Sequence, residues 1–270
     1  MTGLLRKIYL ETRLNIVLFS LGLAAVMALL TRLLPKVLGD IERVFEQLPF
    51  IKPIITALLG IDPGDQLTSQ MTQAFLWVHP TVLSLIWAHE LIFCSRMPAG
   101  EVDRGSIDFL LGLPVSRWKL YFSETVAWIV SGLIILGSGF AGHLWASQTL
   151  GSQMRPTAYA TGCVLLNLFG VYLAVGGMAF LLSAASDRRG RAIGVMFAVL
   201  LVSFLLNFLA QFLESARSFS VLSVIEYYRP AEIIRTQQFP IENMATLLIL
   251  AVCTWLAGGM IFARRSICTV

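Results

Sequence analysis

Six stretches of apolar residues, each about twenty residues long, dominate this sequence. A helix needs about 20 apolar residues to cross the hydrocarbon core of a bilayer. Backbone groups in lipid must be hydrogen-bonded within their own segment or around a closed barrel, which favours helices for runs this long and continuous. We therefore predict an all-α membrane protein with six transmembrane helices, at about residues 14–34, 74–95, 121–146, 159–184, 192–213 and 244–262.

The overall composition agrees with this fold class. Of the 270 residues, 57% are hydrophobic and only 13% are charged, whereas soluble domains carry roughly 25% charged residues. The net charge of +4 comes from short basic clusters beside apolar runs, which is typical of membrane topology and not of nucleic-acid binding. We expect one transmembrane domain over residues 1–270, with the four separated cysteines as small core residues.

The positions of Lys and Arg predict the orientation of the helices. Short loops on the cytoplasmic side of membrane proteins carry an excess of these residues. Alternate loops here hold twelve of the 20 basic residues in short segments, and the other eight are spread through longer loops. We predict that both termini and residues 101–117 are cytoplasmic.

Three further segments are apolar but too short or too broken to span. Leu4, Leu5 and Ile8 share one face of a basic stretch, which predicts an amphipathic helix lying at the inner surface before the first span. The outer loop at residues 35–72 keeps helical apolar spacing and predicts two short helices on the outer leaflet. Residues 219–240 predict short helices dipping into the outer leaflet before the sixth span.

The loop after the second span contains a distinctive pattern. Acidic residues are followed by Ile107, Leu110 and Leu111 at i, i+3, i+4 spacing, and then by Pro114. Such spacing with a proline stop predicts a short amphipathic helix. We expect this helix to be presented to a partner at the membrane surface.

Polar residues within the spans are candidates for function, because ionisable groups in lipid are costly. His89 and Glu90 lie near the inner end of the second span and could form a proton relay or a ligand contact, or could instead reach headgroups or Arg96. The His-Glu-Leu-Ile-Phe sequence lacks the second histidine of a zinc protease motif. His79 and His143 are too few ligands for a metal site, so no metal is expected.

A polar stripe follows one face of the fifth span, at Ser203, Asn207 and Gln211. Hydrogen bonding between helices is one interpretation of this stripe. The lining of a transport route is the other.

The loop after the second span resembles the signature of ABC-2-type transporter permeases, in which an acidic residue is followed by Gly, an aliphatic pair and Pro-Val-Ser-Arg. The matching residues are Glu101, Gly105, Leu110, Leu111, Pro114, Val115, Ser116 and Arg117. The six spans, the amphipathic opening and the ending Phe262-Ala-Arg-Arg265 also fit this family. Two departures are Glu124, where the family often has lysine, and Ser266, where it often has Asp.

The resemblance implies a permease subunit of the cell inner or plasma membrane that dimerises, with itself or with a second permease, and docks separate ATPase subunits. Its coupling helix would contact the ATPase through Glu101, Asp103, Gly105, Ile107, Asp108, Leu110, Leu111, Pro114 and Arg117. Leu4, Leu5 and Ile8 would belong to a connecting helix. The second and fifth spans would line the translocation pathway, with Glu90, Ser203, Asn207 and Gln211 as candidates.

The resemblance also implies that this chain is non-catalytic and holds no cofactor. The sequence has no GxxxxGK[ST] phosphate-binding loop, so ATP and Mg are expected in a partner chain. We expect an exporter of an apolar or amphipathic compound. The alternatives are an ion-coupled carrier with Glu90 as its proton site, which would need internal repeats that are not visible, and a membrane-embedded enzyme using His79, His89, Glu90 or His143.

Overall fold

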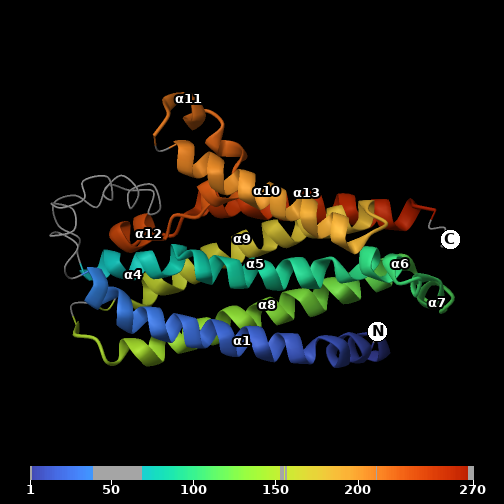
Figure 1. Ribbon diagram of the computed structural model, residues 1–270, viewed down its shortest axis with the longest axis horizontal. Helices are drawn as coiled ribbons and strands as arrows, with labels where there is room; N and C mark the ends of the chain where they lie inside the picture. Colours follow the sequence, from blue (N-terminus) through green and yellow to red (C-terminus); the bar gives the residue numbers. More distant parts are fainter. Residues whose placement is uncertain (1, 39–68, 153–154, 156, 211, 267–270) are drawn as a thin grey trace.

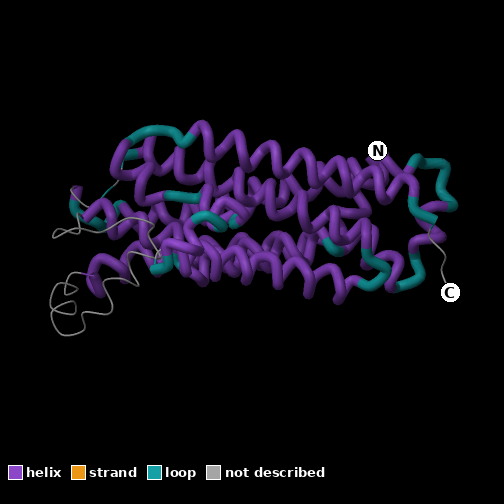
Figure 2. The backbone as a smooth tube through the Cα atoms, turned by 90° about the horizontal axis from the view of Figure 1, so that it is seen from above, coloured by secondary structure: helices purple, strands orange, loops and turns teal. Residues whose placement is uncertain are grey.

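The long helices lie along the long axis of the molecule (Figure 1). The computed structural model describes residues 2–38, 69–152, 155, 157–210 and 212–266. Within these ranges there is no strand (Figure 2). The helices long and apolar enough to cross a membrane are Gly3–Lys36, Ala74–Cys94, Arg117–Ser147, Ala158–Ala185, Arg189–Ala210 and Ile241–Arg264. The six predicted spans are thus confirmed, with most ends within a few residues of the predicted ones.

The first span differs most from the prediction. The expected opening helix and the first span form one helix, α1 (Thr2–Leu38), of 37 residues. Residues 4–13 contain neither Gly nor Pro, so nothing there ends the helix. At 1.5 Å per residue α1 is about 55 Å long, against about 30 Å for the hydrocarbon core. Part of α1 therefore extends beyond the apolar layer.

The second span consists of two helices, α4 (Ser69–Val78) and α5 (Pro80–Cys94). Pro80 occupies the first position of α5, where its missing N–H costs no hydrogen bond. His79 precedes it, and the Nδ1 atom of its ring accepts a hydrogen bond from the Thr81 N–H at 3.3 Å. Pro80 therefore coincides with a short interruption between α4 and α5.

The remaining long helices are α8 (Arg117–Ser147), α9 (Ala158–Ala185), α10 (Arg189–Ala210) and α13 (Ile241–Arg264). Helix α1 packs along α8, and α9 packs along α13. Helix α9 is the most deeply buried of these helices, because 67% of the residues in its most apolar part are buried. Its residue Gly177 lies so close to α13 that a Cβ atom there would be 2.7 Å from the Ala251 carbonyl oxygen. Small residues allow this close packing, as is usual between membrane helices.

Short helices connect α10 to α13, as predicted: α11 (Glu214–Arg217), η3 (Ser220–Leu222), η4 (Val224–Tyr227) and α12 (Pro230–Thr236). Their depth in a bilayer stays a prediction. Tyr228 fixes this connection to the second span, because its hydroxyl donates to the Trp77 carbonyl at 3.1 Å. Burial raises the pKa of Tyr228 well above its usual value, so the hydroxyl keeps its proton. The helices predicted between the first two spans fall mostly at residues 39–68, outside the described residues.

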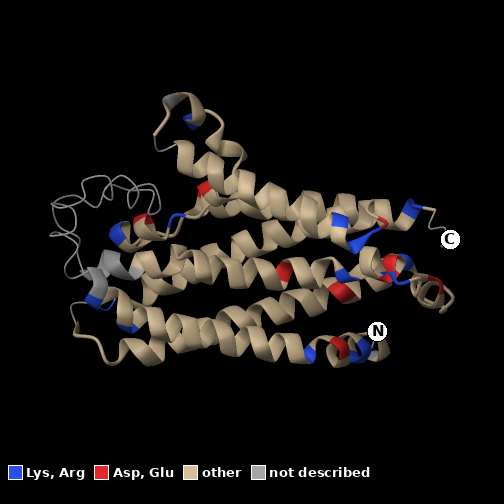
Figure 3. Ribbon diagram, viewed as in Figure 1, with Lys and Arg blue, Asp and Glu red and all other residues tan. Residues whose placement is uncertain are grey.

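Charged residues concentrate at the two ends of the bundle (Figure 3). The start of α1 and the end of α13 lie at the same end, together with the short helices α6 (Glu101–Asp103) and α7 (Ile107–Leu111) (Figure 1). We call this the α7 end, and the opposite end, where α12 lies, the α12 end. The first and last helices thus have their outer ends on the same side of the bundle, as an even number of crossings requires.

Candidate functional site

The chain between α5 and α8, residues 95–116, projects at the α7 end (Figure 1). It begins with a π-helical turn, η1 (Arg96–Gly100), within which Met97 has non-helical angles of φ −135° and ψ 131°. Helices α6 and α7 follow, joined at Gly105, whose φ of +70° suits a residue without a side chain. Helix α7 ends three residues before Pro114. The predicted short helix is therefore two shorter helices separated by a turn.

Helix α7 has one buried and one exposed side. Ile107 and Leu110 are almost fully buried, at 0% and 5% exposure, whereas the Phe109 side chain is 76% exposed. Leu111 is half-buried, and Asp108 is exposed. The apolar spacing in the sequence thus identified the side that holds α7 against the bundle. The apolar side chain that α7 presents outward, Phe109, was not singled out by that pattern.

Glu101 is an anchor and not an exposed contact. It is 5% exposed, and its carboxylate pairs with Arg104 at 3.0 Å and lies 3.8 Å from the Lys7 ammonium. The Ser106 hydroxyl donates to the same carboxylate. A buried charge needs such partners to offset its desolvation. Asp103 is exposed, and accepts a hydrogen bond from the Arg189 backbone N–H at 3.4 Å.

The opening residues of α1 pack against this segment. Ile8 is 3% exposed, and Leu4 and Leu5 are half-buried. Leu4 and Ile8 line a small cavity together with Leu110 and other residues of the segment and of α8. Residues that the sequence places about a hundred positions apart are therefore brought together.

Arg96 holds the segment to two other helices. Its Nη2 atom donates to both carboxylate oxygens of Glu124 on α8, each at 2.6 Å, and its Nη1 atom donates to Glu11 on α1. His89 lies beside the Ser131 hydroxyl, and neither carboxylate oxygen of Glu90 has a side-chain partner among the described residues, so neither residue pairs with Arg96. Glu124 also stands out for another reason, since it replaces the lysine common at this position of the signature. Here it compensates a buried arginine, which the sequence alone did not indicate.

Arg117 fixes the start of α8 to the end of α13. Its Nη1 atom donates to the carbonyl oxygens of Phe262, at 3.1 Å, and of Arg265. Carbonyls at a helix C-terminus lack partners within the helix, and a cation there is stabilising. Arg117 is therefore half-buried within the chain, while Pro114 and Gly105 are exposed on the segment.

The candidate pathway residues lie at two places. Glu90 is fully buried and faces the Gly176 backbone of α9. On α10, the Ser203 carbonyl accepts from the Ser223 hydroxyl at 2.8 Å, and Asn207 donates to the Glu226 carboxylate at 2.9 Å. The described part of the polar stripe therefore bonds to the connection between α10 and α13. Gln211 lies outside the described residues.

A family model described as "ABC-2 family transporter protein" matches residues 90–266. This range covers well over half of the chain and includes the segment between α5 and α8. The chain belongs to the ABC-2 transporter family. No curated protein and no solved structure gave a significant match. The chain is accordingly a multi-pass membrane protein and the permease component of an ABC transporter, a class that is generally non-catalytic.

The three histidines of this ABC-2 permease have different partners. His89 lies 3.3 Å from the Ser131 hydroxyl and packs beside Tyr172. The Nδ1 atom of His143 is 2.9 Å from the Thr31 hydroxyl, and His79 begins α5. Across the residues that the structure describes, there is no group of three or more His, Cys, Asp or Glu side chains that could hold a metal ion.

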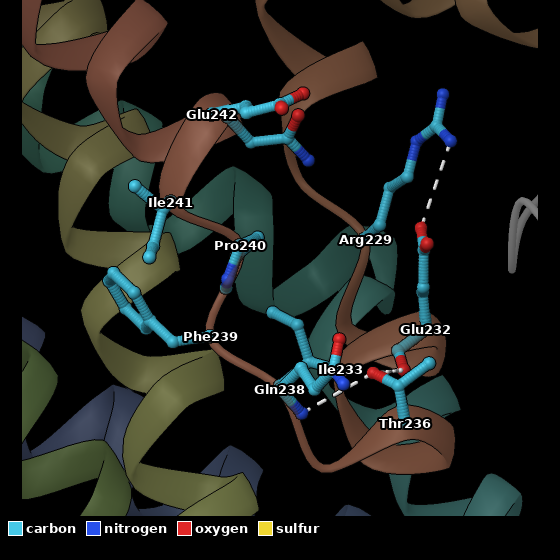
Figure 4. A pocket seen from close by; sticks show the side chains of 10 residues that line it. Arg229, Glu232, Ile233, Thr236, Gln238, Phe239, Pro240, Ile241 and Glu242 are labelled. Carbon is cyan, nitrogen blue, oxygen red and sulfur yellow. Dashed lines mark hydrogen bonds and ion pairs between the residues drawn. The ribbon is translucent and has the colours of Figure 1, made fainter.

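The permease also has a cavity of about 360 Å³ at the α12 end, between α12 and the start of α13 (Figure 4). Arg229 lies at its edge, 3.7 Å from the Glu232 carboxylate, and also pairs with Glu226. Because Glu226 bonds to Asn207, this cavity is connected through polar contacts to the stripe on α10. The sequence did not single out these residues, since their partners are distant or on short irregular helices.

Proposed function

We propose that this ABC-2 permease is the membrane subunit of an ATP-driven exporter, in which a separate ATPase subunit binds ATP and Mg and docks at the α7 end. A second permease subunit, identical or different, would complete the transport route. The absence of a GxxxxGK[ST] loop from the sequence supports the assignment of ATP to a partner chain. The dimer is what the family resemblance implies, and export is our proposal for the direction of transport.

The basic residues support a cytoplasmic α7 end. Helices α1, α8, α10 and α13 all carry Lys or Arg at this end. In the segment between α5 and α8, η1 begins with Arg96 and Arg104 follows α6. An excess of Lys and Arg in short loops is typical of the cytoplasmic side. A cytoplasmic ATPase could then reach α7 without crossing the membrane.

The observation that carries the proposal is the two-sided geometry of α7. Ile107 and Leu110 fix this helix to the bundle, and Phe109 is presented outward at 76% exposure. A large exposed aromatic side chain on a projecting segment is typical of a contact that anchors a partner. Phe109 is therefore the residue that we expect to contribute most to ATPase binding.

The contacts around α7 explain how movement of the ATPase would reach the spans. Glu101 joins the segment to α1 through Lys7, and Arg96 joins it to α1 and α8. Arg189, at the start of α10, bonds to the Ile92 carbonyl at 2.8 Å. A force on α7 would therefore be transmitted to α1, α5, α8 and α10, which can move as rigid bodies.

The test is co-purification of the ATPase subunit with tagged permease variants. We expect Phe109→Ala to weaken the association by about 2 kcal/mol or more, which is about thirtyfold, as for a central aromatic contact. Phe219→Ala is the matched control, because Phe219 is also exposed, at 58%, but belongs to the connection between α10 and α13. Equal ATPase recovery with both variants and the wild type would contradict the proposal.

A further inference from the structure

Glu90 is a fully buried acidic residue whose carboxyl group has no partner. Its side chain is 0% exposed, and neither oxygen has a hydrogen-bond partner among the described residues. The carboxyl group faces the backbone of Gly176 on α9. Burial of an unpaired carboxylate costs far more free energy than burial of a neutral carboxyl group. Glu90 therefore needs a bound cation to offset its charge.

The packing around Glu90 suits a proton and not a larger cation. A Cβ atom on Gly176 would lie 1.9 Å from the ring of Trp128, so this α8 side chain packs directly against the α9 backbone. A metal ion would need several further oxygen ligands. The part of the chain that the structure describes holds no group of three or more His, Cys, Asp or Glu side chains that could supply them. A proton needs neither extra volume nor extra ligands.

The surrounding elements supply no cation to Glu90. Its titratable neighbours are Tyr172 on α9 and Cys94 on α5, and neither side chain can carry positive charge. Helix α4 contains no titratable residue. The charged groups of α1, η1, α8 and α10 nearest the end of α5 have other partners: Glu11 and Glu124 pair with Arg96, and Arg189 donates to Ser95 and Ile92.

His89 and Tyr172 connect the buried carboxyl group to a polar cavity at the α7 end. The cavity has a volume of about 330 Å³, and its lining includes His89 and the exposed residues Glu11 and Asn15. The Nδ1 atom of His89 lies 3.5 Å from the Tyr172 hydroxyl, and Tyr172 is in turn an electrostatic neighbour of Glu90. Imidazole rings and hydroxyl groups both donate and accept protons. The two side chains thus form a route for a proton between the cavity and Glu90.

We propose that Glu90 is a proton-binding site of the packed bundle, which exchanges its proton with the α7 end by way of His89 and Tyr172. When α5 and α9 separate, the carboxyl group gives its proton to water and the resulting carboxylate is hydrated. The packed arrangement therefore holds one proton more than the separated one, so a rise in pH favours separation. The proposal requires neither net proton transport nor the ATPase.

Infrared spectroscopy of the purified 270-residue chain tests the bound proton, in a detergent that has no carbonyl group. At about pH 8 solvated Asp and Glu side chains are ionised, since their ordinary pKa is about 4. We expect the wild type to keep the C=O band of a protonated carboxyl group, and Glu90→Gln to lose it. Glu124→Gln is the matched control and should keep the band, because Glu124 is also buried but is paired with Arg96. The proposal is overturned if the wild type has no such band or if Glu90→Gln retains it.

The shift of this band after transfer to D2O tests the route. We expect His89→Leu to keep the band and to slow its shift, because the side chain that links the cavity to Tyr172 is removed. His143→Leu is the control, since His143 is equally buried but lies beside Thr31. Equal rates of shift in both variants and the wild type would exclude the route through His89.

The labelling rate of Cys94 by a thiol reagent tests the coupling to helix separation. Cys94 is 0% exposed and lies one helical turn after Glu90. The pH dependence of the thiol chemistry is common to the wild type and Glu90→Gln, so it cancels in the ratio of their rates. For release of one proton we expect this ratio to rise by up to about tenfold per pH unit above about pH 6. A ratio that does not change with pH would overturn the coupling.

Discussion

Helices α1 and α8 approach each other closely at Gly142, which makes substitution there a sensitive test of the packing. A Cβ atom on Gly142 would lie 2.3 Å from the carbonyl oxygen of Ala24, whereas ordinary contacts begin at 3.4 Å. Because the obstructing atom belongs to the backbone of α1, no side-chain rotation can relieve the overlap. The Gly142→Ala variant therefore has to separate the two helices by about 1 Å, and overpacking of this kind costs about 1–3 kcal/mol.

Two other glycines of α8 supply controls. Nothing lies within 4 Å of a Cβ atom built on Gly137, and a Cβ atom on Gly139 would meet the flexible side chain of Leu23 at 2.8 Å. Each Gly→Ala change also raises helix propensity by about 1 kcal/mol in an exposed helix interior. This gain is common to all three variants, so the difference between Gly142→Ala and Gly137→Ala isolates the cost of the overlap. Gly139→Ala should fall between them.

Thermal unfolding in detergent, followed with a thiol-reactive dye, can measure this series. Cys94 and Cys163 are buried and become reactive on unfolding, while Cys253 is exposed and reacts from the start. An overlap cost of 2 kcal/mol corresponds to a difference of about 4–8 °C in the unfolding midpoint for a chain of this size. If Gly142→Ala were as stable as Gly137→Ala, the close contact between α1 and α8 would be wrong.

Two further substitutions test buried polar contacts with the same assay. Glu124→Gln removes a carboxylate from Arg96, and breaking a buried pair costs about 3–5 kcal/mol, here towards the lower value because a second carboxylate remains. Asp187→Asn is its control, since Asp187 is 74% exposed and its pair with Arg265 should contribute at most about 1 kcal/mol. Equal losses of stability in the two variants would argue against the buried pair. Thr31→Val removes the 2.9 Å contact with His143, and should cost about 0.6–1.7 kcal/mol, the range for hydrogen bonds between membrane helices. An unchanged midpoint for Thr31→Val would show that this contact does not contribute to stability.

The spans were predictable because their signal is local. A run of about twenty apolar residues requires a helix in lipid whatever surrounds it. Pro80 coincides with the start of a new helix, whereas α1 continues through Pro35. The continuity of α1 was predictable in principle, since residues 4–13 lack helix breakers, but the change from charged to apolar composition suggested two elements. A helix continues until a residue breaks it, whereas the polarity of its side chains decides which part of it lies in the apolar layer.

The candidate site was predictable only in part. The spacing of Ile107 and Leu110 correctly predicted an amphipathic helix, but periodicity cannot say whether the apolar side faces the bundle or a partner. The structure shows that it faces the bundle, which leaves Phe109 outward. The pairs of Arg96 with Glu11 and Glu124 join three distant parts of the chain. No local pattern indicates such contacts, because they depend on how the helices pack.

The most direct measurement of the central claim is site-specific photo-crosslinking from α7 in native membranes. A photoreactive phenylalanine analogue replaces Phe109 in one variant and Phe219 in another, both of which are exposed aromatic positions. We predict a crosslink from position 109 to an ATPase subunit and none from position 219. The account would be contradicted if the ATPase subunit were crosslinked from position 219 and not from position 109. It would also be contradicted if the permease were recovered intact and position 109 gave no crosslink to an ATPase subunit.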